Sequence, residues 1–273
     1  MCDIKVLESF KKGKKDDKTC EDMLFISKDF IAVIDGVTSK SDFRYKDQTS
    51  GKIAAQLVSE TLKMLPADAD VKLFVDSANE AINHFYETVD FPYDRDQMGL
   101  QAAGVVYSAY FNEIWLIGDC QAAVDGKTYL NPKKSDEILA AFRCLVLQIL
   151  KDEGEREKET QQKDEAREMI LPWILRSTRY ANDDTTEYGY SVLNGHPVPD
   201  QLIKKIALDT GSHEVILTSD GYPVIERNLE ESEKTLSRLL KEDPACCIQI
   251  HSTKGVGEGQ GSFDDRTFVR FLV

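Results

Sequence analysis

The sequence predicts an α+β fold. Apolar runs with strand-like composition cluster near the N-terminus, in the middle and at the C-terminus, and segments with helical spacing lie between them. No regular alternation of one strand with one helix is present, and a doubly wound parallel sheet would require that alternation. The 273 residues, of which 41% are hydrophobic, can bury a sizeable core. We therefore expect a single domain over residues 1–273.

The N-terminal half predicts a strand pair, two helices and further strands. Residues 23–27 and 30–34 are short apolar runs separated by two polar residues, which is typical of a hairpin. Apolar residues then recur at helical spacing over residues 50–65 and again over 71–85. Residues 99–124 return to strand character and predict two long antiparallel strands.

The stretch from about residue 132 to 179 differs from its surroundings. An apolar helical piece at 138–150 leads into an almost wholly charged run at 151–169, and a second apolar piece follows. We interpret the stretch as a helical, charge-rich insertion whose charged run is a solvated helix or a connector. Gly, Asn and Pro in the next segment, at about 180–199, indicate turns.

The C-terminal part returns to strands and helices. It predicts a strand at 214–218, a helix at 229–241, a short helix after Pro244 and a final strand at 266–273.

Composition excludes several classes of function. The net charge of −14 disfavours nucleic acid and anionic membranes as partners. No window approaches the roughly 20 apolar residues of a membrane span, and the N-terminus lacks the apolar core of a secretory signal, so a cytoplasmic location is expected. The six cysteines and four histidines are dispersed, with no C-x-x-C pair and no recognisable ligand spacing. We expect neither a zinc site nor a disulfide framework.

Acidic residues stand where strands begin or end. Asp35-Gly36 and Asp220-Gly221 each end a continuous apolar run, whereas Asp125-Gly126 has alternating residues on both sides, as a two-residue hairpin turn requires. Asp264 and Asp265 precede the final strand. Carboxylates at the ends of adjacent buried strands suit a hard cation such as Mg²⁺ or Mn²⁺. Asp is also common in turns and helix caps, so both interpretations stay open.

The order of several motifs resembles the metal-dependent protein phosphatases of type 2C. The motifs are CEDMLF, FIAVIDG, GLQAAGVVYSAY followed by IWLIGDCQAAV, then VILTSDG and SFDDRTFV. The resemblance covers nearly the whole chain apart from the charged insertion. It implies an αββα sandwich of two antiparallel β-sheets flanked by helices, in which residues 180–199 would be a flap beside the active site. It also implies hydrolysis of phosphoserine or phosphothreonine by direct attack of a metal-activated water.

The resemblance further implies two Mg²⁺ or Mn²⁺ ions and their ligands. Asp35 would bridge the ions, the Gly36 carbonyl would bind one of them, and Asp220 and Asp264 would complete the other site. Glu21 and Asp22 would act directly or through metal-bound water. The resemblance makes Asp35, Asp220 and Asp264 the catalytic residues.

Asp119 resembles the Asp that helps to hold a third metal in this family. The partner position for that ion is Val224 here, so a purely structural turn at Gly118-Asp119 is the alternative.

The chain departs from the family at three further positions. Asp17 stands where an Arg commonly binds the substrate phosphate, and Lys14, Lys15 or Lys18 could substitute as point charges. Val37 replaces a His that protonates the leaving alcohol, so water is the expected acid. Gln121 replaces an Arg and is expected to cost a structural contact.

Two alternative functions stay open. One is a small-molecule phosphomonoesterase, and the other is a catalytically weak regulatory or binding module on the same fold. The expected partner is a phosphoprotein or phospho-metabolite substrate, and the sequence does not indicate an oligomeric state.

Overall fold

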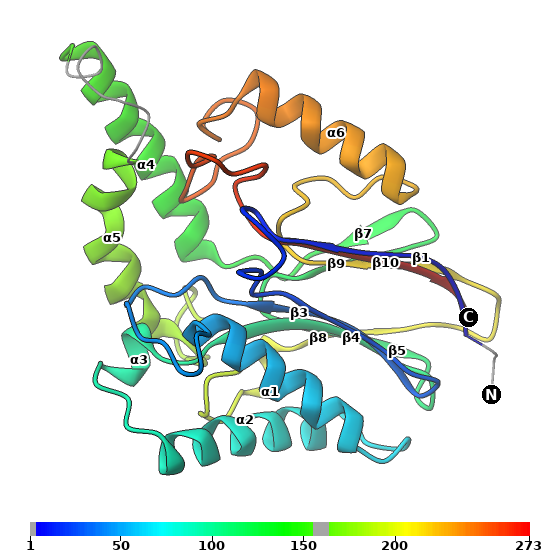
Figure 1. The fold of residues 1–273 in the computed structure, drawn as a ribbon. Coiled ribbons are helices and arrows are strands. Elements are labelled where there is room, and N and C mark those ends of the chain that lie inside the picture. Colours follow the sequence, from blue (N-terminus) through cyan, green and yellow to red (C-terminus); the bar gives the residue numbers. More distant parts are fainter. Residues whose placement is uncertain (1–3, 155–163) are drawn as a thin grey trace.

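Two five-stranded antiparallel sheets pack face to face in the computed structural model, which describes residues 4–154 and 164–273 (Figure 1). The first sheet contains, in spatial order, β1 (Lys5–Lys12), β10 (Arg266–Leu272), β9 (Glu214–Thr218), β6 (Gln121–Val124) and β7 (Lys127–Tyr129). The second contains β2 (Met23–Ile26), β3 (Phe30–Gly36), β4 (Ala102–Ser108), β5 (Glu113–Ile117) and β8 (Lys204–Ala207). The predicted sandwich is confirmed.

Helices cover the outer faces of both sheets. The second sheet carries α1 (Ser50–Met64) and α2 (Val71–Thr88), and the first carries α6 (Leu229–Glu242) (Figure 1). The helices α4 (Lys134–Asp152) and α5 (Glu165–Ser177) project from one end of the sandwich, near the short α3 (Arg95–Met98). Two 3₁₀ turns, Thr178–Tyr180 and Asp200–Leu202, complete the helical elements. No described helix combines the length and the apolar composition that a membrane span requires.

The sandwich explains why its central strands are apolar on both faces. On β3, Ile31 and Val33 point into the core between the sheets, whereas Ala32 and Ile34 point toward α1 and α2. Successive side chains of a strand alternate between faces, so a strand covered on both sides reads as a continuous apolar run. This arrangement buries β3 up to its end, where Asp35 lies.

Most predicted elements are present, with two corrections. The hairpin at residues 23–34, the helices before and after residue 66, α6 and the final strand are confirmed. The predicted short helix after Pro244 is wrong, because residues 244–250 form turns and bends there. The second long strand predicted within 99–124 is also wrong. It divides at Gly118, and its two parts, β5 and β6, belong to different sheets.

The insertion is helical on both sides of its charged run. Residues 155–163 of that run lie outside the described residues, and α4 and α5 flank them. A disulfide joins Cys144 on α4 to Cys247 in the loop after α6. The dispersed spacing of the cysteines did not predict this pair.

The β6–β7 hairpin is confirmed and is fixed by a histidine. Asp125 and Gly126 have φ angles of 49° and 80°, and Val124 pairs with Lys127. His213 Nδ1 lies 2.7 Å from Asp125 Oδ2, and its Nε2 lies 2.9 Å from Asp209 Oδ1. These two hydrogen bonds raise the pKa of His213 above its ordinary value of 6.5.

The hydrogen bonds of His213 to Asp125 and Asp209 are expected to make the free energy of unfolding depend on pH. Because the folded pKa is raised, the contribution is complete below the unfolded pKa and is lost as pH rises through the folded pKa. We expect His213→Gln to lower the unfolding midpoint by about 2 °C at pH 6 and by less at pH 9. Thermal unfolding at the two pH values measures this, and a deficit that grows with pH would contradict it.

Candidate functional site

Four of the five aspartates that line one pocket at an end of the sandwich are predicted site residues. Asp35 ends β3, Asp119 lies between β5 and β6, Asp220 follows β9 and Asp264 precedes β10, and all four line the pocket. The pocket encloses about 120 Å³. Both sheets and the crossing between them therefore contribute an acidic residue to the same space.

The sheet topology brings these residues together. In the first sheet β9 and β10 are antiparallel neighbours, and Thr218 at the end of β9 pairs with Phe268 near the start of β10. Asp220, just after β9, and Asp264, just before β10, therefore lie at the same end of this sheet. Gly118 has a φ of 81°, a left-handed conformation that suits glycine, and it redirects the chain from β5 toward β6 at Asp119.

Gly36 and Gly51 allow the end of β3 to contact the start of α1. A Cβ atom on Gly36 would clash with the Gly51 carbonyl and lie 2.7 Å from the Glu21 carbonyl. A Cβ atom on Gly51 would lie 2.9 Å from the Gly36 carbonyl oxygen and 3.0 Å from Glu21 Oε1. The Gly36 carbonyl and the Glu21 carboxylate therefore both lie close to the backbone of Gly51.

Burial raises the pKa of several of these acids. It raises the pKa of Asp35 well above 3.8, and the nearby Asp22 and Asp264 add to the effect. Burial also raises the pKa of Asp220 well above 3.8, and the nearby Asp35 and Asp264 raise it further. The pKa of Asp119 is raised by burial and by Asp136. Such crowded carboxylates ionise together only when cations offset their charge.

Asp22 is wholly buried and does not line the pocket. Its Oδ2 accepts hydrogen bonds from Ser219 Oγ at 2.7 Å and Thr267 Oγ1 at 2.8 Å. Burial raises its pKa to about 8, although these two hydrogen bonds oppose the shift. The Oδ1 atoms of Asp22 and Asp220 are buried without a hydrogen-bond partner among the described residues.

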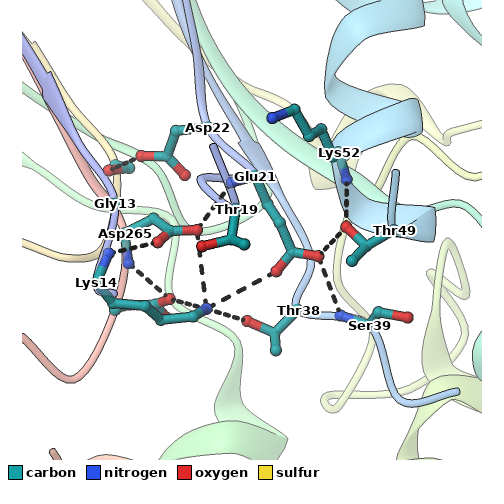
Figure 2. Close-up of polar contacts among 12 residues, drawn as sticks. Gly13, Lys14, Thr19, Glu21, Asp22, Thr38, Ser39, Thr49, Lys52 and Asp265 are labelled. Atoms are coloured by element: carbon teal, nitrogen blue, oxygen red, sulfur yellow. Dashed lines mark hydrogen bonds and ion pairs between the residues drawn. The ribbon is translucent and has the colours of Figure 1, made fainter. Parts of the chain in front are cut away.

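Two lysines lie against Asp264. Lys14 Nζ is 3.1 Å from Asp264 Oδ1, 3.7 Å from Glu21 Oε2 and 3.8 Å from Asp265 Oδ2. Figure 2 shows Lys14 reaching between Asp265, Glu21 and Thr38. Lys254 pairs with the other oxygen of Asp264. Burial alone would raise the pKa of Asp264, but the ammonium groups of Lys254 and Lys14 hold it below its ordinary value.

The acidic residues suit a hard cation by their chemistry. All the predicted ligands offer oxygen, and the buried Oδ1 atoms of Asp22 and Asp220 lack a hydrogen-bond partner within residues 4–154 and 164–273. In that same part of the chain no three His, Cys, Asp or Glu side chains are arranged as a metal-binding group. Asp264 binds Lys14 and Lys254 instead. A divalent ion at Asp264 would therefore have to displace an ammonium group.

The lysines proposed as substitutes for the missing arginine have different positions. Lys14 lies among the carboxylates, whereas Lys15 and Lys18 are exposed and do not line the pocket. Asp17 accepts a hydrogen bond from the Gly13 amide at 3.3 Å, so it shapes the loop after β1.

Two other departures from the family also have a structural explanation. Val37, which stands in place of the family's proton-donating His, lines the pocket. The Gln121 side chain donates to the Tyr222 carbonyl at 2.7 Å, a contact made inside the fold.

Sequence reasoning missed the basic side of the pocket. The basic residues that line this side belong to no common motif, because they come from four separate segments. They are Lys40, Lys133, Arg167 and Lys254. A cation in a charged segment usually indicates a solvated surface, so the sequence held no signal for this arrangement.

Comparison with solved structures identifies the fold. PstP/Ppp, a serine/threonine phosphatase of Mycobacterium tuberculosis, matches with a TM-score of 0.50 at 19% identity, over 99% of this chain and 98% of that one. The PstP catalytic domain in complex with two manganese ions matches with a TM-score of 0.50 at 18% identity, over 99% of each chain. PppA of Pseudomonas aeruginosa matches with a TM-score of 0.50 at 13% identity, over 99% of this chain and 97% of that one. No family model and no curated protein matches the chain. The chain has the fold of the PPM serine/threonine phosphatases.

Proposed function

We propose that the chain is a Mg²⁺- or Mn²⁺-dependent phosphatase that hydrolyses phosphoserine or phosphothreonine monoesters. The observation that carries the proposal is the convergence of aspartates from both sheets, and from the crossing between them, on one small pocket. Asp35 and Asp220 form no ion pair with any described residue, although burial raises the pKa of both. A bound cation would offset this unfavourable burial of charge.

The residues divide into metal-holding and supporting roles. Asp35, the Gly36 carbonyl, Asp220, Asp264 and Glu21 would hold the ions. Divalent ions bound there would activate the attacking water and offset charge on the phosphoryl oxygens.

The residues around the proposed ligands support the site. Asp22 is fixed by hydrogen bonds from Ser219 and Thr267 to its Oδ2, which leaves its buried Oδ1 without a partner among the described residues. Asp119 borders the pocket on the side of the sheet crossing and is the candidate for a third ion. Val37 offers no proton, so solvent is the proposed acid for the leaving alcohol.

A regulatory or binding module is the second candidate. It is favoured by Lys14 and Lys254, whose ammonium groups already neutralise Asp264 without a metal. In such a module the lysines would replace the cations permanently, and the chain would bind no divalent ion at this site.

Metal binding and turnover together separate the two candidates. We would titrate Mn²⁺ calorimetrically and measure hydrolysis of p-nitrophenyl phosphate and of a phosphothreonine peptide, with and without Mn²⁺. The phosphatase proposal expects binding and metal-dependent turnover of both substrates. Turnover of p-nitrophenyl phosphate alone would favour a small-molecule enzyme. Absence of both binding and turnover would favour the module.

Tyr190 is expected to influence substrate preference. It is buried in the pocket wall with Lys133 Nζ 4.3 Å from its ring centroid, whereas Tyr188 does not line the pocket. We expect Tyr190→Leu to change relative rates across a phosphopeptide panel by about threefold or more, since a changed wall alters fit near the reacting group. Tyr188→Leu is the matched control. Equal relative rates in wild type and Tyr190→Leu would contradict the prediction.

A further inference from the structure

The pocket has a basic wall beside its acidic residues. The wall consists of Lys40 after β3, Lys133 at the start of α4, Arg167 in the first turn of α5 and Lys254 before β10. Two of the four come from the insertion, which packs against the end of the sandwich (Figure 1). The insertion thus contributes directly to the site.

The members of the wall differ in how their charge is offset. Lys254 pairs with Asp264, and Lys133 Nζ lies 3.0 Å from Asp136 Oδ1. Lys40 donates to the Thr38 carbonyl at 3.4 Å, and Arg167 donates to the Thr253 carbonyl at 2.7 Å. Across residues 4–154 and 164–273, neither Lys40 nor Arg167 forms an ion pair with a carboxylate. Two cations therefore line the pocket without a carboxylate of the described residues at ion-pair distance.

Electrostatics support the need for an anion. Burial and the adjacent Lys133 lower the pKa of Lys40 to about 8, although Asp136 opposes them. Burial also lowers the pKa of Arg167, although the more distant carboxylates of Asp264 and Asp164 oppose the shift. A partly buried cation without a carboxylate in direct contact is unfavourable, and an anionic ligand would offset that cost.

The size and position of the pocket limit the ligand. Its volume of about 120 Å³ is below the roughly 300–1,000 Å³ of sites for drug-sized molecules, so it suits one small group. Asp35 and Asp220 line the same pocket, so an anion on the wall lies beside the proposed metal-binding acids. A tetrahedral phosphoryl group matches both the size and the charge.

We propose that Lys40 and Arg167 bind the phosphoryl oxygens of the substrate. The assignment rests on the proposed function, and it gives the insertion the phosphate-holding role for which residue 17 offers only Asp. Arg167 supplies a planar guanidinium that can donate two parallel hydrogen bonds, and Lys40 adds a point charge. Both act by positioning the phosphoryl group and leave the attack on phosphorus to water.

Binding of inorganic phosphate tests the assignment without requiring turnover. We would titrate phosphate calorimetrically into wild type, Lys40→Met and Arg167→Met, once with Mg²⁺ and once with EDTA. We expect wild type to bind in at least one condition and each variant to bind about 10- to 100-fold more weakly. Lys63→Met and Arg227→Met, at exposed positions away from the pocket, are the matched controls and should bind as wild type does.

Two further measurements keep the outcomes distinct. Arg167→Lys keeps the positive charge and should bind phosphate more tightly than Arg167→Met does. Circular dichroism checks that each variant folds. No phosphate binding by wild type, or equal binding by wild type and both Met variants, would overturn the assignment. A chain without turnover whose phosphate binding still requires Lys40 and Arg167 would refute the proposed hydrolysis and leave the anion site standing.

Discussion

Asp35→Asn and Asp220→Asn are each expected to reduce metal-dependent hydrolysis by about a thousandfold or more, because each removes a charged ligand from the proposed ions. The amide keeps the shape of the side chain and lacks its charge. Turnover of p-nitrophenyl phosphate with Mn²⁺ measures the loss. Asp68→Asn, at an exposed position, is the control and should retain full activity.

The same variants should have the opposite effect on the stability of the metal-free chain. Burial raises the pKa of Asp35 and Asp220, so between 3.8 and the folded pKa the folded chain binds protons that the unfolded chain has released. Stability therefore falls as pH rises through that range. Because an amide does not titrate, either Asn variant lacks the part of this loss that its Asp causes. Each variant should therefore be more stable than wild type at pH 8 but not at pH 4.

Stability and activity thus move apart at these two positions. Mn²⁺ should raise the unfolding midpoint of wild type and have little effect on the variants, since a ligand stabilises only the state that binds it. Loss of both activity and metal-free stability would indicate that Asp35 and Asp220 are structural residues, and retained activity would refute their proposed role.

The sequence predicted the strands that carry the acids better than it predicted their neighbours. Continuous apolar runs before Asp35 and Asp220 indicated buried strands, and the structure confirms both. β1 escaped prediction because all of its side chains are half-buried or exposed at the edge of a sheet, without a regular alternation, so its pattern is weak. The crossing at Gly118 was missed because a single glycine inside an apolar run does not reveal a change of sheet.

The basic wall could not be predicted for a different reason. Lys40 and Arg167 are 127 positions apart in the numbering, and only the docking of α4 and α5 against the sandwich brings them to one pocket. The Cys144–Cys247 disulfide has a separation of 103 residues and depends on the same docking. Local patterns contain no information on such contacts, whereas strand ends follow from local composition and pairing.

Arg143 holds that docked region together. Its side chain, buried to 2% exposure, pairs with Asp164 and donates to the Ala245 and Ser252 carbonyls at 2.9 and 3.2 Å. Asp164 in turn caps α5 and accepts from the Gly255 amide at 3.1 Å. One guanidinium therefore links α4, α5 and the loop that carries Lys254.

Arg143→Met is expected to lower the free energy of unfolding by about 3 kcal/mol, because it leaves a carboxylate and two carbonyls without their donor while keeping much of the side-chain volume. Urea unfolding under reducing conditions measures the loss without the Cys144–Cys247 bond, which ties α4 to the same loop. Arg227→Met, whose side chain is 84% exposed, should change stability by less than about 0.5 kcal/mol. Arg143→Lys should recover only part of the loss, since an ammonium cannot replace the guanidinium fork. A loss below about 1 kcal/mol for Arg143→Met would mean that the insertion docks mainly through its apolar contacts, and that the basic wall does not depend on this arginine.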